Sequence, residues 1–391
     1  IIIDYFYGYV KRLNRKRPNF LNYFDGFYLQ NKKVYYIMNR VELCVPKVVL
    51  MRGWQITEPG KIGEINKIES LSGVDSVKIK LTRTLITEED IAIFAGDEKS
   101  VKLPIIPGRA AVGQITELGQ PSPYLGKGTR VFLSPVKPCG ECYHCANDKH
   151  GKCYNFSVAG RTTDGFLKDF VVLDSDNVYP LPQNVMDDDA VYIDYIMLAI
   201  SAIDKLQIEK GEHVAVFGSS VLGSIIAQLI IYYQGVPILI GNDENELLLA
   251  KKSGIYYAIK TSQKTEKEIS SFTSGRMAEK VIYLTRSGIT VESALKAAAP
   301  FSKVAFAGYS APNLKVPFGL AMTKQLTNIC VTNGYGNAEA AINILSNKAI
   351  DLSNYKLPVM KMESIEKEMT ARLELFNEKK LVPGLLVNML G

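Results

Sequence analysis

The chain has 391 residues, of which 47% are hydrophobic and 22% are charged, and these values are ordinary for a globular protein. Its length favours two domains, and the lack of a membrane-spanning apolar run or a secretion signal favours a cytoplasmic protein that has no membrane partner. The net charge of +6 arises in residues 1–40, which hold eight Lys or Arg and two Asp or Glu; the remainder is balanced and gives no electrostatic reason to expect nucleic-acid binding.

The first segment differs in composition from the rest of the chain. Residues 1–37 are rich in Ile, Tyr, Phe, Asn and Lys, and the first methionine is Met38. We therefore interpret 1–37 as a non-native or disordered extension, translated from upstream sequence, that precedes a start at Met38. The alternative is a native basic and aromatic arm that binds a nucleic acid or another partner. The intact mass of natively expressed protein separates the two interpretations.

The half that follows predicts an irregular β domain. Short β-rich runs separated by Gly and Pro extend from Val41 to Pro182, without the alternation of strands and helices that a parallel sheet requires. One short helix is expected within residues 87–96. Thr87 is its expected N-cap, and Asp90 stands at the fourth position of a capping box.

Four of the six cysteines lie close together in the segment 138–153, with the spacing C-x2-C-x2-C-x7-C. Four thiolates complete a tetrahedral Zn²⁺ site, so we expect one structural zinc per chain with no open position for a substrate. Disulfides are disfavoured because no secretion signal is present and Cys44 and Cys330 stand apart, where we expect two buried thiols. The expected ligands are Cys139, Cys142, Cys145 and Cys153.

From Met186 onward, strands and helices alternate and predict a doubly wound parallel sheet. A helix through residue 206 is expected to be capped by the acidic run 187–189. Strands are expected at 213–217, 236–240, 256–259, 280–284 and 303–308, and helices at 221–234, 244–253, 263–274 and 290–299. A helix at 338–347, a charged helix at 362–378 and a strand at 384–390 complete the chain.

A glycine-bounded turn joins the strand 213–217 to the apolar helix that follows, which is the context of a dinucleotide-binding turn. Gly218 provides the tight turn, Gly223 allows close packing of helix and strand, and the helix N-terminus favours a pyrophosphate. Ser220 replaces the middle glycine of the usual pattern, and the alternative is a purely structural turn. The expected coenzyme contacts are Gly218, Ser219, Ser220, Val221, Leu222, Gly223, Gly241 and Asn242.

The choice between NAD and NADP stays open in the sequence. Gly241 stands where an acid that binds the ribose 2′-hydroxyl is expected, which favours NADP. Asp243, however, would repel a 2′-phosphate, and no basic residue follows before Lys251.

The cysteine segment in a β-rich half, followed by a dinucleotide turn, closely resembles the zinc-containing medium-chain alcohol dehydrogenase superfamily. The resemblance runs from about Val41 to the C-terminus and includes the segments PCGECYHC and KGEHVAVFGSSVLG. It implies a GroES-like catalytic domain (38–185, with the zinc lobe at 138–153), a Rossmann domain (186–335) and a C-terminal return to the catalytic domain (336–391). It also implies hydride transfer between NAD(P)(H) and a small-molecule substrate, in a homodimer or homotetramer.

The family's catalytic zinc ligands are not kept in this chain. By the resemblance, Thr87 stands at the ligand cysteine, Glu89 at the residue that relays protons, and Asp194 at a late ligand position. Arg109 replaces the ligand histidine, and its guanidinium has no lone pair to donate. Arg109 and Asp194 would either pair and fill the vacated cage, or present Arg109 as an anchor for a substrate carbonyl or carboxylate.

Three functions follow from these residues. The first is an NAD(P)(H)-dependent oxidoreductase without catalytic zinc, acting on a polarised carbonyl or conjugated acceptor, with Arg109, Asp194, Thr87 and Glu89 at its site and Tyr192 and Tyr195 as further proton donors. The second is a zinc-dependent alcohol, polyol or sugar dehydrogenase with atypical ligands. The third is a nucleotide-binding protein without turnover.

Overall fold

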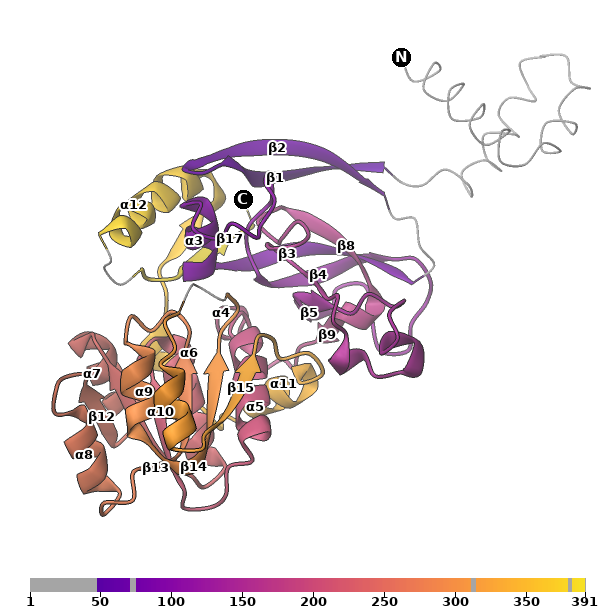
Figure 1. Cartoon of the computed structure of the whole chain (residues 1–391). Helices are drawn as coiled ribbons and strands as arrows, with labels where there is room; N and C mark the ends of the chain where they lie inside the picture. Colours follow the sequence, from indigo (N-terminus) through magenta and orange to yellow (C-terminus); the bar gives the residue numbers. More distant parts are fainter. Residues whose placement is uncertain (1–47, 71–74, 311–313, 379–381, 391) are drawn as a thin grey trace, which may run out of the picture. The chain divides into compact units, whose positions relative to one another are not determined.

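The computed structural model describes residues 48–70, 75–310, 314–378 and 382–390 (Figure 1). The proposed extension 1–37 and Cys44 lie outside these residues. None of the helices within the described ranges combines the length and apolar character needed to cross a bilayer. The described chain contains two large sheets, one mostly antiparallel and one parallel.

The parallel sheet has the strand order β12-β11-β10-β13-β14-β15 within the described residues, which is the doubly wound order of a dinucleotide-binding fold. The order reverses between β10 and β13, so a crevice forms outside the carboxyl ends of these two strands. The strands are β10 (His213–Phe217), β11 (Val236–Gly241), β12 (Tyr257–Lys260), β13 (Ala278–Leu284), β14 (Ala298–Ala307) and β15 (Thr327–Val331).

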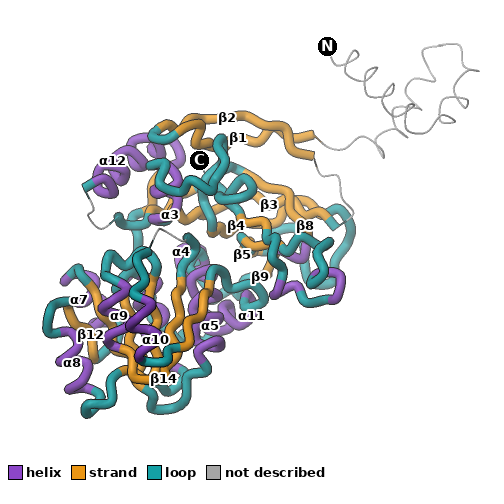
Figure 2. Tube along the Cα trace, in the orientation of Figure 1, coloured by secondary structure: helices purple, strands orange, loops and turns teal. Residues whose placement is uncertain are grey.

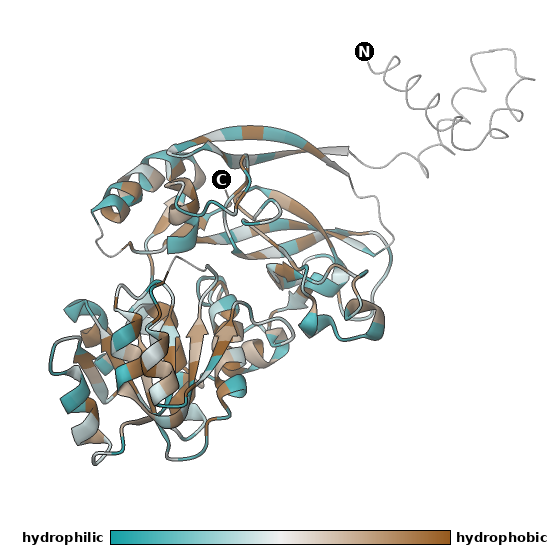
Figure 3. Cartoon of the chain, in the orientation of Figure 1, coloured by the Kyte–Doolittle hydropathy of each residue, from teal (hydrophilic) through white to brown (hydrophobic). Residues whose placement is uncertain are grey.

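Alternate residues of this sheet face two separate hydrophobic cores. Val214 and Val216 pack with α5, α6 and α11, whereas Ala215 and Phe217 pack with α8, α9 and α10. The central parts of these strands are therefore mostly apolar, and much of this sheet is brown in Figure 3. The helices are α5 (Ile193–Leu206), α6 (Val221–Tyr232), α7 (Glu244–Lys252), α8 (Thr265–Phe272), α9 (Val291–Ala297), α10 (Phe318–Thr323) and α11 (Ala338–Ser346).

The other large sheet has the order β16-β17-β3-β4-β5-β9 in the described chain, with β8 also paired to β3. The C-terminal β17 pairs antiparallel with β3, so the end of the chain returns to the N-terminal strands. Its members are β3 (Ser76–Ile86), β4 (Ala110–Leu118), β5 (Arg130–Leu133), β8 (Phe170–Asp174), β9 (Val178–Pro180), β16 (Val359–Lys361) and β17 (Leu385–Asn388).

A long hairpin and two helices cover this sheet and share one core with it. Met51 and Ile56 of the hairpin pack with Ile91 of α3 and Met369 of α12. Helices α3 and α12 also contact each other (Figure 2). This packing fixes the start of α3, which faces the candidate site. The elements are β1 (Val48–Glu58), β2 (Lys61–Ser70), α3 (Glu88–Phe94) and α12 (Ile365–Asn377).

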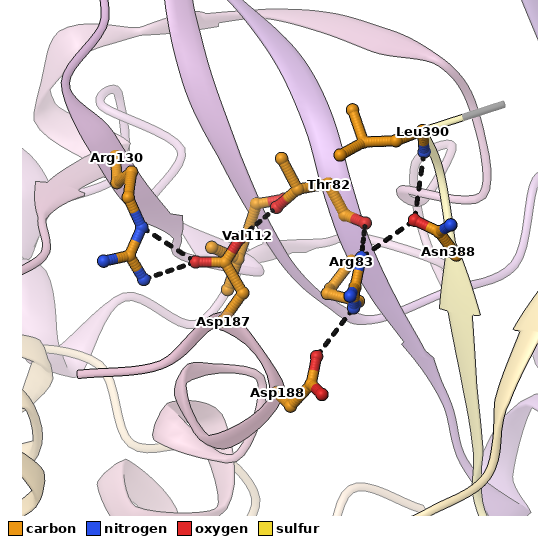
Figure 4. Close-up of polar contacts among 8 residues, drawn as sticks. All are labelled: Thr82, Arg83, Val112, Arg130, Asp187, Asp188, Asn388 and Leu390. Carbon is orange, nitrogen blue, oxygen red and sulfur yellow. Dashed lines mark hydrogen bonds and ion pairs between the residues drawn. The ribbon is translucent and has the colours of Figure 1, made fainter.

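The acidic run 187–189 does not cap a helix, and this expectation was wrong. Met186 is the N-cap of the short helix α4 (Asp187–Ala190), and the aspartates lie in its first turn. The carboxylates of Asp187 and Asp188 are bound by the neighbouring sheet instead (Figure 4). Arg130 Nε donates to Asp187 at 2.9 Å, and Arg83 Nε donates to Asp188 at 2.6 Å. The run therefore joins α4 to strands β3 and β5.

Cys330 is exposed, so the expectation of a buried thiol was also wrong at this position. It lies on β15, the last strand of the parallel sheet within the described residues, and Thr327 and Asn328 of the same strand are exposed too. In the described chain no strand pairs with the outer edge of β15, and most of its side chains are accessible to solvent, although Val331 is buried.

Candidate active site

The four cysteines of the segment 138–153 form one cluster. All four sulfur atoms lie within 4.8 Å of one another. The Sγ of Cys139 is 3.9 Å from that of Cys145 and 3.6 Å from that of Cys153, and the Sγ atoms of Cys142 and Cys153 are 4.0 Å apart. A tetrahedral zinc with Zn–S bonds of about 2.3 Å needs sulfur atoms about 3.8 Å apart. The cluster therefore fits a structural zinc.

Backbone groups support the sulfur atoms of this cluster. The N–H groups of Cys142 and Asn155 point at Cys139 Sγ and Cys153 Sγ, each with a nitrogen–sulfur distance of 3.4 Å. Gly140 has a φ of 79°, which a glycine adopts without strain and which turns the chain back toward the cluster. The local sequence thus builds the cage without a ligand from elsewhere.

The glycine-bounded turn after β10 has little space for larger side chains. A Cβ at Gly223 would lie 1.8 Å from the carbonyl oxygen of Gly218, and a Cβ at Gly241 would lie 2.1 Å from Ser219 Oγ. Gly218 itself has a φ of 127°. These contacts hold the N-terminus of α6 close to the end of β10, which leaves its N–H groups available to an anion.

A cavity of about 970 Å³ opens at the carboxyl ends of β10 and β13. Its volume lies at the upper end of the range for ligand sites. Six of the eight predicted coenzyme contacts line this cavity. The other two, Gly223 and Gly241, do not line it and instead pack closely against neighbouring atoms. The six are Gly218, Ser219, Ser220, Val221, Leu222 and Asn242.

Two carboxylates that were not among the predicted coenzyme contacts lie at one end of this cavity. This end is next to β11. Asp243 and Glu246 both line it, and Asp243 also caps α7 by accepting the N–H of Glu246 at 2.9 Å. Ser219 Oγ donates to Glu246 at 2.6 Å, and burial raises the pKa of Glu246. An acid is therefore present near the end of β11. It is Asp243, which lies two positions after Gly241, the position at which the sequence interpretation expected an acid.

Arg109 and Asp194 form a buried ion pair, as one of the two sequence interpretations predicted. Arg109 Nε lies 2.7 Å from Asp194 Oδ2, and the side chains are 7% and 2% exposed. Burial opposes the charge of Arg109, but the carboxylate of Asp194 keeps the pKa of Arg109 raised. Neither residue lines the cavity.

Tyr309 completes the surroundings of this pair. Its ring lies 3.9 Å from the guanidinium carbon of Arg109, which is a cation–π contact, and its hydroxyl donates to the carbonyl oxygen of Asp194 at 3.0 Å. Arg109 Nη2 and Asp194 Oδ1 are buried and have no hydrogen-bond partner among the described residues. The pair thus fills its site but leaves one donor and one acceptor unsatisfied.

Thr87 and Asp90 fasten the start of α3 to the segment that carries Arg109. The N–H of Thr87 donates to Asp90 Oδ2 at 2.8 Å, as the expected capping box requires, and Thr87 Oγ1 donates to the same oxygen at 2.9 Å. The N–H of Gly108 donates to Asp90 Oδ1 at 2.8 Å. Thr87 does not line the cavity, so its place in the structure supports positioning of α3 rather than contact with a ligand.

Glu88 and Glu89, in the first turn of α3, do line the cavity. Sequence reasoning chose Glu89 and missed Glu88. Burial, followed by the charge of Glu89, raises the pKa of Glu88 to about 7. The only sequence signal for it was a second carboxylate beside Glu89, because the burial that shifts its pKa comes from distant segments.

Tyr192 and Tyr195 also line the cavity. The hydroxyl of Tyr192 donates to the carbonyl oxygen of Tyr355 at 2.9 Å, and burial raises the pKa of both tyrosines. Tyr195 stacks on Tyr309 with ring centroids 5.9 Å apart. The Tyr192 hydroxyl is therefore already engaged, whereas Tyr195 forms part of the wall between the cavity and the buried ion pair.

Comparisons with known proteins agree with this arrangement. Residues 73–183 match the alcohol dehydrogenase GroES-like domain. An uncharacterized zinc-type alcohol dehydrogenase-like protein of Haemophilus influenzae is 26% identical over 74% of this chain and 86% of its own length. The sorbitol dehydrogenase of Halalkalibacterium halodurans is 31% identical over 55% of this chain and 64% of its own.

Solved structures show the same fold. A short chain alcohol dehydrogenase, RspB, from Escherichia coli CFT073 in complex with the cofactor NADH superposes with a TM-score of 0.73. The match covers 87% of this chain and 99% of that one at 23% identity, so it speaks for the fold alone.

The GroES-like sheet, the doubly wound sheet and the four-cysteine lobe form the architecture that is typical of medium-chain dehydrogenases/reductases, a class of oxidoreductases. In its GroES-like domain and in its fold, the chain is similar to the zinc-containing medium-chain alcohol dehydrogenase superfamily.

Proposed function

We propose that the protein is an NAD(P)(H)-dependent oxidoreductase that reduces a small, polarised carbonyl or conjugated acceptor without a catalytic metal. The observation that carries this proposal is the buried pair of Arg109 and Asp194 at two positions where the resemblance expects zinc ligands. A guanidinium offers no lone pair to zinc and repels a cation. Without a Lewis acid, an acceptor that is already polarised is the easier substrate.

The pair itself is proposed to hold the site in shape rather than to touch the substrate. Arg109 and Asp194 lie behind the wall that includes Tyr195, and Tyr309 covers the guanidinium. Glu89 and Tyr195 then remain as the polar groups that face the substrate end of the cavity. The bound coenzyme would supply the hydride, while these side chains orient the acceptor and hold a proton near its oxygen.

The coenzyme is proposed to lie across the turn 218–223, with its adenosine ribose near the end of β11. Asp243 and Glu246 line that end of the cavity, and a carboxylate there accepts from a ribose hydroxyl but repels a 2′-phosphate. Fluorescence titration should therefore show NADH binding about 10-fold or more tightly than NADPH. Replacing both acids (D243N with E246Q) should narrow this ratio, and a wild-type preference for NADPH would contradict the assignment.

The domain limits follow the resemblance: a catalytic domain at 38–185 and 336–391, and a coenzyme domain at 186–335. The protein is further proposed to be a homodimer or homotetramer. The side chains of Phe301, Phe318 and Met322 are exposed on β14 and α10, the two elements that precede β15 in the chain, and a second copy would hide them together with the unpaired edge of β15. Light scattering should give a mass at least twice that of the chain; a monomer at micromolar concentration would exclude this surface as an interface.

A turnover measurement distinguishes the proposed oxidoreductase from a protein that binds the nucleotide but has no catalytic activity. Oxidation of NADH or NADPH should be measured with a panel of enones, iminium compounds and activated ketones. Consumption of coenzyme with at least one acceptor supports an oxidoreductase. Coenzyme binding without turnover on the whole panel would favour the nucleotide-binding alternative.

A further inference from the structure

The cavity wall carries an excess of acidic groups, although the proposed ligand is an anion. Among the described residues that line it, only Arg286 and Lys356 are cations. Five carboxylates face the same space from α3, the segment after α3, and the start of α7: Glu88, Glu89, Asp97, Asp243 and Glu246. A dinucleotide would add the two negative charges of its pyrophosphate to this set.

Arg286, the cation whose charge lowers the pKa of Glu88, already binds other groups. Arg286 forms an ion pair with the buried carboxylate of Glu98, lies 3.4 Å from Asp97, and donates from Nε to Ser310 Oγ at 2.8 Å. The same Glu98 carboxylate also binds Arg161 at 3.0 Å. Arg286 therefore offsets the charge of Glu88 only in part.

Glu88 is the carboxylate of this wall on which the charges of both Glu89 and Glu246 act. It projects from the first turn of α3, lines the cavity together with the turn 218–222, and makes no hydrogen bond to any described residue. Burial, the charge of Glu89 and the charge of Glu246 all raise its pKa, against the opposing charge of Arg286. Its pKa of about 7 means that the free protein holds both forms near neutral pH.

We propose that Glu88 binds the dinucleotide in its neutral form, so that each coenzyme that binds takes up one proton at this carboxyl group. The inference rests on the proposed coenzyme site. The proton comes from solvent, and the resulting O–H can donate to an oxygen of the pyrophosphate. An ionised Glu88 would instead repel that group, because the burial of Glu88 weakens the screening of its charge by water.

The direction of the pH dependence follows from this linkage. Below about pH 7, Glu88 is already neutral, and binding needs no proton. Above about pH 7, Glu88 is mostly ionised in the free protein and must gain a proton when NADH binds. The affinity for NADH therefore falls as the pH rises, and the fall approaches about 10-fold per pH unit.

The test is calorimetric titration of the protein with NADH at pH 8, in two buffers that differ in ionisation enthalpy. Wild-type protein should take up close to one proton per NADH, and ADP-ribose, which carries the pyrophosphate without nicotinamide, should give the same value. In E88Q the uptake should disappear, and affinity should become independent of pH between 6 and 9. E339Q is the matched control, because Glu339 also lies in the first turn of a helix but is exposed, and it should behave as wild type.

The outcomes separate this inference from the proposed function. NADH that binds without proton uptake in wild-type protein would overturn it, and that measurement does not depend on whether any variant folds. Uptake that persists in E88Q, or that occurs with NADH but not with ADP-ribose, would also overturn it. Failure to bind any dinucleotide between pH 6 and 9 would instead remove the coenzyme site itself.

Discussion

Replacing Cys145 by serine is expected to remove the zinc and to destabilise the catalytic half of the protein. Cys145 is the last cysteine of the short C-x2-C-x2-C run and is buried, and its sulfur lies 3.9 Å from that of Cys139. Structural zinc sites hold their metal with a free energy of about 10 kcal/mol or more, and that energy is available only to the folded protein. Loss of even part of it should lower the melting temperature by about 10 °C or more.

Metal analysis and thermal unfolding measure both effects. Zinc should fall from about one per chain to near zero in C145S. The control is C330S, which changes an exposed thiol outside the cluster and should keep both the zinc and the melting temperature. Full zinc content in C145S would show that the four cysteines do not form the site.

Replacing Arg109 by alanine is expected to destabilise the protein by about 3–5 kcal/mol, because it leaves the buried carboxylate of Asp194 without its partner. Denaturant unfolding measures this free energy. The control is K61A, which breaks the exposed pair of Lys61 and Glu58 at the tip of the β1–β2 hairpin and should cost less than about 1 kcal/mol.

A double replacement tests whether the pair has only a structural role. In the double variant R109M with D194L, two apolar side chains of similar size replace both charged side chains. The substitutions also remove the two unsatisfied atoms, Arg109 Nη2 and Asp194 Oδ1. Stability should return to within about 1–2 kcal/mol of wild type, because no buried charge or unpaired polar atom remains. A stable double variant that binds coenzyme but has lost all turnover would instead make Arg109 a catalytic residue.

Local patterns were sufficient to predict the zinc lobe and the dinucleotide turn. Cys139, Cys142 and Cys145 are so close in the chain that any compact loop brings them together, and the closest contact at Gly223 is with Gly218, five positions earlier. The alternation of strands and helices was enough to predict the doubly wound sheet, although α10 and β15 were missed. Their sequences are short and lack a clear apolar period.

Features that depend on distant segments were predicted only in part. The approach of Arg109 to Asp194 followed from the family resemblance, since 85 positions separate them. The shifted pKa of Glu88 depends on burial and on the charges of Glu246, on α7, and Arg286, in the segment after β13, both of which are distant in the sequence. The exposure of Cys330 depends on β15 being the outermost described strand, which its own composition does not reveal.

The most direct test of the central claim is the number of zinc ions per chain in protein that is actively transferring hydride. Elemental analysis should be made on the same sample whose turnover with NADH has been measured. The account predicts about one zinc per chain, held by the four cysteines, in fully active protein. Two zinc ions per chain, or activity that rises in proportion to a second bound metal, would contradict it and favour a zinc-dependent dehydrogenase with atypical ligands.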